Sequence, residues 1–105
     1  MQSNKFNCLT KDISVDFIAK DIFISDMTSY IMGNAQPTDI LITINRNKNI
    51  IAVASLIGIS CIIFPNAIQP ETEWLALAEQ EGISVYTTEL SAARAAKELY
   101  EILSL

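Results

Sequence analysis

Three short runs of β-branched residues alternate with three helix-patterned segments between residues 39 and 103. The runs are DILITI, ISCIIF and ISVYTT, and the segments that follow them are NKNIIAVASLIG, PETEWLALAEQEG and residues 89–103. This order is typical of a parallel sheet built from right-handed crossover units. The sequence therefore predicts an α/β fold, a small layered domain with a mostly parallel sheet from βα units and helices on both faces.

Turn and cap residues set the expected boundaries. Gly33, Gly58 and Gly82 each follow a helix-patterned segment, where a left-handed C-terminal cap favours a residue without Cβ. The expected strands span residues 5–10, 40–44, 59–64 and 83–86, and residues 15–19 with 21–24 are expected to form one or two more. The expected helices span residues 25–32, 48–57, a segment from residue 70, and residues 89–103.

The first of these helices is short. Ser25 or Asp26 is its expected N-cap, since a side-chain oxygen there accepts a hydrogen bond from the first turn. Met27, Tyr30 and Ile31 would then share one face of the helix, which we expect to be its core face.

Length and composition bound the class of protein. The 105 residues are enough for one domain with a core, so residues 1–105 are expected to form a single domain. With a net charge of −5 and no basic run, phosphate-directed binding to nucleic acid or to anionic membranes is not expected. The apolar run at residues 50–64 is shorter than the roughly 20 residues of a membrane span.

The two cysteines and the first residues indicate the compartment. Cys8 and Cys61 fall inside strand-like runs and form no CxxC pair, so we expect buried, reduced thiols. Residues 1–7 lack the basic-then-apolar pattern of a secretory signal. A cytoplasmic location follows from both observations.

The helix expected at residues 48–57 carries apolar side chains around almost its whole axis, and Ser55 is its polar exception. A helix that covers one face of a sheet normally shows a solvated stripe. Either the sheet and the N-terminal segment bury this helix, or a second subunit does. Because a chain this small has little material to cover both sides, we expect a homodimer.

Ligands of open parallel sheets bind beyond the carboxyl ends of the strands. The residues that the pattern places there are Asn45, Arg46, Asn47, Pro65, Asn66, Thr87, Thr88 and Glu89. They include no histidine, no cysteine and no nucleophile beside a base, and no metal-ligand spacing is present. We therefore expect neither catalysis nor a metal or other cofactor.

Arg46 is the candidate anion-binding residue, because it directly precedes a helix N-terminus, where free N–H groups favour an anion. Asn45, Asn47 and Asn49 could help to hold a phosphate or carboxylate. The alternative is that Asn47 or Asn49 caps the helix and that Arg46 is a solvated loop charge. Trp74, on the next helix, is expected to pack in the core rather than to line a pocket.

The chain resembles the DRTGG domain family over residues 6–103, and most of all the small stand-alone versions found near iron-only hydrogenase components. The residues that carry the resemblance are the Ser25-Asp26 helix start, the TDILITI strand, the NIIAVASL helix, the turn at Glu81-Gly82-Ile83 and the TTELSAA start of the last helix. The N-terminal domain of HPr kinase/phosphorylase looks related in fold.

The resemblance implies an α/β fold, homodimerisation and no catalysis. Similar domains are regulatory or dimerising pieces of larger proteins, among them inorganic pyrophosphatases in which they accompany nucleotide-binding CBS modules. The Asp-Arg-Thr stretch of the family is Asn45-Arg46-Asn47 in this chain, and its Thr-Gly-Gly falls near Phe64-Pro65-Asn66 without a glycine.

The sequence leads to one functional hypothesis and one alternative. The hypothesis is a non-catalytic regulatory or accessory module that senses a small anionic ligand such as a nucleotide. The expected ligand-binding residues are Asn45, Arg46, Asn47, Asn66, Thr87 and Thr88. The alternative is a protein-interaction subunit of a redox or hydrogenase-type complex, which binds its protein partner through an apolar surface and takes no ligand.

Overall fold

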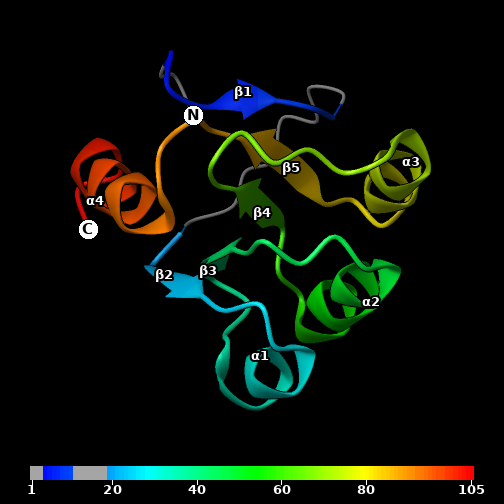
Figure 1. Cartoon of the computed structure of the whole chain (residues 1–105). Coiled ribbons are helices and arrows are strands. Elements are labelled where there is room, and N and C mark those ends of the chain that lie inside the picture. The colour runs from blue at the N-terminus through cyan, green and yellow to red at the C-terminus, as the bar shows by residue number, and fades with distance from the viewer. Residues whose placement is uncertain (1–3, 11–18) are drawn as a thin grey trace.

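The computed structural model describes residues 4–10 and 19–105, and its sheet has the strand order β1-β5-β4-β3-β2 (Figure 1). Strands β2 to β5 are parallel, and β1 pairs with β5 in the antiparallel direction. The elements are β1 (Asn7–Cys8), β2 (Asp21–Ile24), α1 (Thr28–Asn34), β3 (Asp39–Ile42), α2 (Lys48–Ile57), β4 (Cys61–Phe64), α3 (Thr72–Gln80), β5 (Ser84–Thr87) and α4 (Ala92–Ile102).

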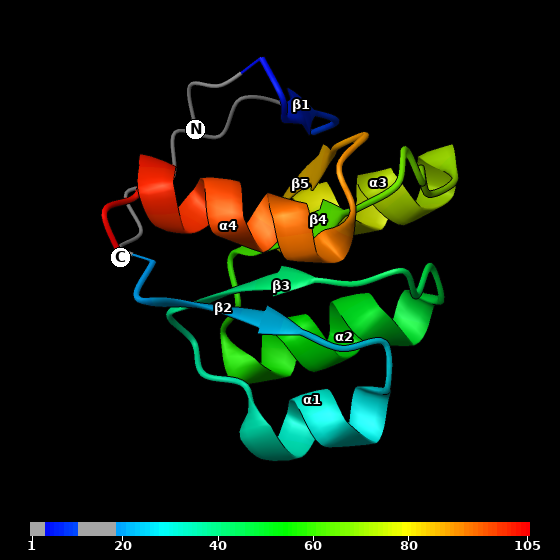
Figure 2. The ribbon, with the colours of Figure 1, turned by 60° about the vertical axis from the view of Figure 1, so that its left-hand side comes forward.

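Helices cover both faces of this sheet, which confirms the predicted fold class. Helices α1, α2 and α3 lie on one face, and α4 lies alone on the other (Figures 1 and 2). The arrangement follows from the sequence of β3 and β4, in which every residue is buried. Along β4, Ile62 packs in the cluster under α2 and α3, whereas its neighbour Ile63 packs in the cluster under α4. A strand that is apolar at every position needs cover on both faces.

Most of the expected boundaries agree with the structure. Strand β2 and helix α2 have the predicted bounds, while β3, β4 and β5 each differ by one or two residues at one or both ends. The strand expected at residues 5–10 is reduced to Asn7–Cys8. The strand expected at residues 15–19 lies outside the described residues except for Ala19. No helix of the described residues is long and apolar enough to cross a membrane.

The N-cap predicted for the first helix is wrong, and the predicted apolar face is buried only at Ile31. Helix α1 begins at Thr28 with Met27 as its N-cap, and the Ser25 hydroxyl instead accepts a hydrogen bond from the Met27 N–H at 3.2 Å. Ile31 is fully buried, but Met27 is 61% and Tyr30 55% exposed. Helix α1 lies beside α2 at the margin of the sheet, so only a narrow side of it finds a partner.

The role predicted for glycine holds at two positions of three. Gly58 and Gly82 have left-handed backbones, with φ of 96° and 72°, and Gly58 caps α2. Gly33 instead lies within α1. This helix ends at an extended Ala35, so its C-terminal cap has no left-handed residue. The expectation for Gly33 is therefore wrong.

Gly58→Ala should lower the free energy of unfolding by about 1–2 kcal/mol, because a Cβ is strained at φ 96°. Gly33→Ala is the matched control. Nothing lies within 4 Å of its added Cβ. The control should therefore raise the free energy of unfolding by about 0.5–1 kcal/mol. Urea denaturation measures both changes, and equal effects of the two substitutions would contradict this assignment.

The cysteines differ in exposure, so the expectation of two buried thiols is wrong for Cys8. Cys8 lies in the two-residue edge strand β1, and its thiol lies 3.4 Å from the Thr10 carbonyl rather than in the core. Cys61 is buried under α4, and burial raises the pKa of its thiol to about 12.

A thiol reagent at neutral pH should therefore label Cys8 rapidly and Cys61 only after unfolding, because the thiolate is the reactive form. The measurement is the number of thiols that react with Ellman's reagent in native buffer and in concentrated urea. We expect one in the first and two in the second, and Cys8→Ser should abolish the native reaction. Fast labelling of the Cys8→Ser protein would contradict the burial of Cys61.

Candidate functional site

Four segments meet at the carboxyl-end edge of the sheet. The loops after β3, β4 and β5 reach it because these strands are parallel. Strand β1 runs the other way, with Asn7 opposite Thr87, so the residues before β1 also lie at this edge. Side chains from residues 4–7 are thereby brought beside those of residues 67–69 and 87–90.

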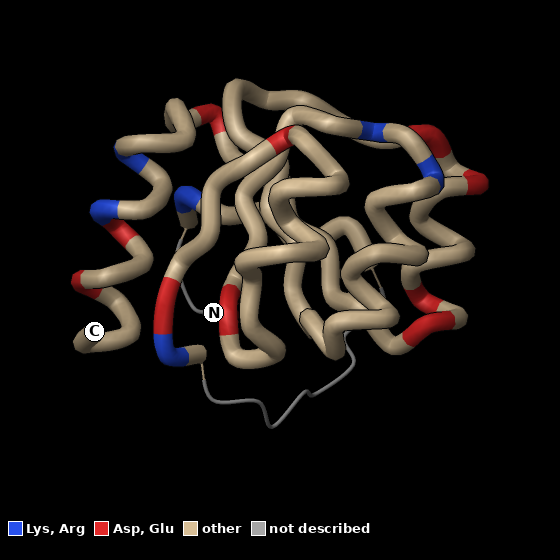
Figure 3. Tube along the Cα trace, turned by 90° about the horizontal axis from the view of Figure 1, so that it is seen from below, with Lys and Arg blue, Asp and Glu red and all other residues tan. Residues whose placement is uncertain are grey.

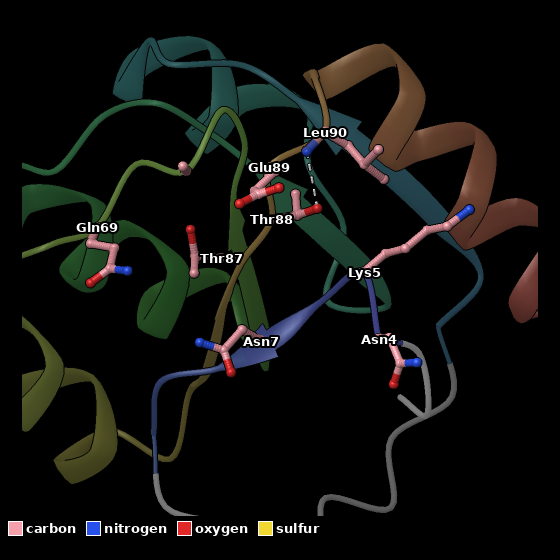
Figure 4. Close-up of a pocket in the computed structure, with 9 residues that line it drawn as sticks. Asn4, Lys5, Asn7, Gln69, Thr87, Thr88, Glu89 and Leu90 are labelled. Carbon is pink, nitrogen blue, oxygen red and sulfur yellow. Dashed lines mark hydrogen bonds between the residues drawn. The ribbon is translucent and has the colours of Figure 1, made fainter.

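The larger cavity at this edge has a volume of about 440 Å³ (Figure 4). Its lining consists of Asn4, Lys5, Asn7, Ala67, Gln69, Thr87, Thr88, Glu89 and Leu90. The Thr87 hydroxyl donates to the Ile68 carbonyl at 2.7 Å, and the Thr88 hydroxyl oxygen accepts from the Leu90 N–H at 3.2 Å. The Thr88 hydroxyl proton has no acceptor among the described residues.

A strained turn forms one wall of the larger cavity. Asn66 and Ala67 both have left-handed backbones, with φ of 56° and 59°, which is unfavourable for residues with a Cβ. Two main-chain hydrogen bonds hold the turn, from the Asn66 N–H to the Leu90 carbonyl at 2.8 Å and from the Ala67 N–H to the Thr88 carbonyl at 2.7 Å. Main-chain hydrogen bonds therefore hold the loops after β4 and β5 together.

The smaller cavity, of about 290 Å³, lies at the N-terminus of α2 and is lined by Arg46, Lys48, Glu71 and Trp74. One guanidinium nitrogen of Arg46 donates to the Gln69 carbonyl at 3.2 Å. Because Gln69 also lines the larger cavity, the two cavities are neighbours. The Lys48 ammonium lies 3.6 Å from the Glu73 carboxylate, and both side chains are largely exposed.

Two asparagines shape the loop that carries Arg46. The Asn45 amide group donates to the Asp26 carbonyl at 2.9 Å and accepts from the Asn47 N–H at 2.8 Å. Asn47 is the N-cap of α2 and accepts from the Asn49 N–H at 2.9 Å. Of the two caps considered from the sequence, Asn47 is the one present.

Trp74 both packs in the core and lines a cavity, the two roles that the sequence left open for it. It is buried, with its ring 5.2 Å from that of Phe64 in an edge-to-face arrangement, and its indole N–H donates to the Asn47 carbonyl at 3.2 Å. One edge of the same side chain lines the smaller cavity. The core thus fixes the position of the cavity wall.

The predicted site residues share the carboxyl-end edge but divide between the two cavities. Thr87 and Thr88 line the larger one and Arg46 lines the smaller one, while Asn45 and Asn47 build the loop around Arg46. Asn66 is exposed in the turn beside the larger cavity. That these six bind a ligand stays a prediction.

Sequence reasoning missed Asn4, Asn7, Gln69 and Lys48 as cavity residues. Asn4 and Asn7 are there because β1 is antiparallel to β5, a pairing that the short apolar stretch around them does not specify. Lys48 could have been found, since it stands two residues after Arg46 in the first turn of α2.

Both cavities are lined by charges of both signs, and Figure 3 shows positive and negative residues interspersed along the chain. The Lys5 ammonium binds the Glu98 carboxylate at 2.7 Å, and this hydrogen bond holds the pKa of Glu98 below its usual value. The larger cavity is lined by one cation and one acid, Lys5 and Glu89, whereas Arg46 and Lys48 of the smaller cavity face one acid, Glu71. An anion is therefore better matched to the smaller cavity. Within residues 4–10 and 19–105, His, Cys, Asp and Glu form no group of three that could hold a metal.

The architecture and the edge cavities define an α/β module with a mostly parallel sheet. Among solved structures, the chain is similar to the CBS and DRTGG domains of the regulatory region of Clostridium perfringens pyrophosphatase, crystallised with the activator diadenosine tetraphosphate. The TM-score is 0.72 at 18% sequence identity, and the match covers 88% of this chain and 40% of that one. No protein-family model and no curated protein matches the chain. The similarity shows the fold, which agrees with the resemblance found in the sequence.

Asn47→Ala should lower the free energy of unfolding by about 1 kcal/mol, because it removes the side chain that caps α2. Asn49→Ala is the control, since only the main-chain N–H of Asn49 takes part in the cap. Urea denaturation of both variants measures the difference. An equal or greater loss in Asn49→Ala would contradict the observed cap.

Proposed function

We propose that this chain is a non-catalytic regulatory or accessory module of the cytoplasm that senses a small anionic ligand, with a nucleotide as the leading candidate. The observation that carries the proposal is the pair of cations at the smaller cavity, Arg46 and Lys48. Support comes from the fold, because a similar fold occurs in a regulatory region crystallised with a nucleotide activator.

The smaller cavity has the chemistry that an anion needs. A guanidinium carries five N–H donors, and the one hydrogen bond that Arg46 makes within the described part of the chain leaves others for a ligand. The N-terminus of the ten-residue helix α2 lies beside it and adds a partial positive charge, although Asn47 already accepts the N–H groups of Asn49 and Ile50. An arginine held against such a terminus can clamp a phosphate or carboxylate with two parallel bonds.

The other predicted residues take complementary roles in this proposal. Asn45 and Asn47 position the Arg46 loop through their side-chain hydrogen bonds. Thr87, Thr88 and Asn66, around the larger cavity, would meet the uncharged part of the ligand. A nucleotide has such a division, with phosphates at one end and a neutral, hydrogen-bonding base and sugar at the other.

The test is thermal unfolding against a panel of adenine and guanine nucleotides, acyl phosphates and inorganic anions. A ligand at about a hundred times its dissociation constant adds about 2.7 kcal/mol. In a domain of this size that raises the midpoint by on the order of 10 °C. Arg46→Ala should abolish the shift, whereas Arg94→Ala, which removes the chain's other arginine from exposed α4, should retain it. A flat panel, or equal losses in both variants, would contradict the proposal.

The second candidate is a protein-interaction subunit of a redox or hydrogenase-type complex. The observation in its favour is apolar surface, above all Leu56 on α2, which is 75% exposed. Ala52 and Ser55 are exposed as well, so α2 does have a solvent-facing side, and that side is weakly polar. For such a subunit Arg46→Ala would leave partner assembly unchanged, while Leu56→Glu would weaken it.

The proposed module works as a homodimer, as the resemblance implies. A single copy buries β3 and β4 on both faces and leaves apolar side chains exposed elsewhere. A second copy is the simplest partner for such a surface, because one self-complementary patch then covers both copies.

A further inference from the structure

Strand β2 forms an open margin of the sheet. It pairs with β3, and no other described segment lies beyond it. Figures 1 and 2 show β2 at the outside of the molecule with α1 to one side and α4 to the other. An edge strand carries main-chain N–H and C=O groups without ladder partners, which another strand can satisfy.

The ladder around β3 shows which groups of β2 face outward. The Ser25 N–H donates to the Ile42 carbonyl at 3.2 Å, and the Thr43 N–H donates to the Ile63 carbonyl of β4 at 3.1 Å. Since N–H directions alternate along a strand, the amides of Asp21 and Phe23 face β3, and those of Ile22 and Ile24 face outward. The alternation begins at Asp21, because the Lys20 N–H before the strand also faces β3 and donates to the Thr38 carbonyl at 2.9 Å. The Asp21 carboxylate, which accepts from the Ile22 N–H at 2.8 Å, agrees with this direction.

Exposed apolar side chains surround the carboxyl end of this edge. Ile24 ends β2, and Met27 and Tyr30 follow it in the chain. The Tyr30 ring lies 5.9 Å from that of Phe23. Ile44, also exposed, belongs to the same corner, because the Asn45 side chain beside it donates to the Asp26 carbonyl.

We propose that β2 pairs antiparallel with β2 of a second copy of this chain, centred on Phe23. This inference rests on the homodimer of the proposed function and names its interface. Ile22 then lies opposite the second copy's Ile24, so that the outward N–H and C=O groups of both residues meet in two hydrogen-bonded pairs related by symmetry. The main-chain N–H and C=O groups of Phe23 stay paired with β3 of its own copy. The two sheets become one continuous sheet.

Charge complementarity selects this register and this partner. Lys20 lies opposite the second copy's Asp26, and symmetry repeats the pair. Both side chains are exposed, and neither makes an ion pair within the described part of the chain. A shift of two residues in either direction places Lys20 or Asp26 opposite an isoleucine and loses both ion pairs.

The hydrogen bonds of Asp21 are compatible with the pairing, because each one that pairing breaks has a replacement in the dimer. In the free chain its carboxylate covers the Ile22 N–H and accepts from the Tyr100 hydroxyl at 2.5 Å. On pairing, the second copy's Ile24 carbonyl replaces the carboxylate at Ile22, and Asp21 comes to lie opposite the second copy's Ser25. The Ser25 hydroxyl oxygen accepts from the Met27 N–H, so its proton can be donated to that carboxylate. A partner strand without a hydroxyl opposite Asp21 would not restore the hydrogen bond that the Asp21 carboxylate gives up at Ile22.

Sedimentation equilibrium of the full chain, without ligand, tests the inference. We expect the wild-type protein to sediment at twice its 11.6 kDa mass at submillimolar concentration. Lys20→Asp and Asp26→Lys each replace two attractive pairs per dimer with two repulsive ones, and should each raise the dissociation constant about tenfold. The double variant Lys20→Asp/Asp26→Lys restores opposite charges and should return it to within about threefold of wild type.

Glu81→Lys is the charge-matched control for Asp26→Lys, because Glu81 is exposed at the end of α3, away from β2, and it should leave the dissociation constant unchanged. A monomeric wild-type protein overturns the homodimer and the interface together. A dimer that the single variants do not weaken, or that the double variant does not rescue, overturns the β2 interface while leaving a dimer in place. None of these outcomes depends on ligand binding, which the Arg46→Ala titration decides separately.

Discussion

The complete burial of β3 and β4 is the constraint from which the rest of the structure follows. Their successive side chains enter two different clusters, one under α2 and α3 and one under α4. Helices α2 and α3 connect β3 to β4 and β4 to β5, and such crossovers join parallel strands, while α4 covers the other face. Parallel strands end together, and that alone places the loops after β3, β4 and β5 at one edge.

The single helix on its face of the sheet is attached at both margins. Glu98 of α4 binds Lys5, two residues before β1, and Tyr100 of α4 binds Asp21 of β2 at the opposite margin of the sheet. The second contact lowers the pKa of Asp21 and raises that of Tyr100, because the hydroxyl proton binds the ionised carboxylate. Both bonds are exposed and contribute little stability in water, but together they attach α4 to both margins of the sheet.

What the sequence predicts well is what burial dictates. The continuous apolar runs DILITI and ISCIIF specify parallel strands, and Asn47 with Gly58 specifies the limits of α2. What it predicts poorly lies at the margins of the sheet, where packing is one-sided. Met27 and Tyr30 fit the pattern of a core face yet remain exposed, because α1 has a neighbour along only one side.

The candidate site shows the same division. Arg46, Thr87 and Thr88 are placed by the parallel strands that precede them, so their position at the edge follows from the pattern. Asn4 and Asn7 depend on the antiparallel pairing of a two-residue strand, which carries too few side chains to specify a partner or a register. The part of the cavity wall formed by Asn4 and Asn7 therefore could not be predicted from the sequence.

The proposed ligand site and the proposed interface are joined by a short chain of hydrogen bonds. The Asp26 carbonyl, at the end of the interface, binds the Asn45 side chain, which binds the Asn47 N–H, and Asn47 in turn caps α2 beside Arg46. A ligand that moves the Arg46 loop must strain or release this chain, and pairing of β2 acts on its other end. If the two events are coupled, each changes the affinity of the other by the same factor. The proposed regulatory module needs such a connection between ligand and assembly, and the proposal assigns it to Asp26, Asn45 and Asn47.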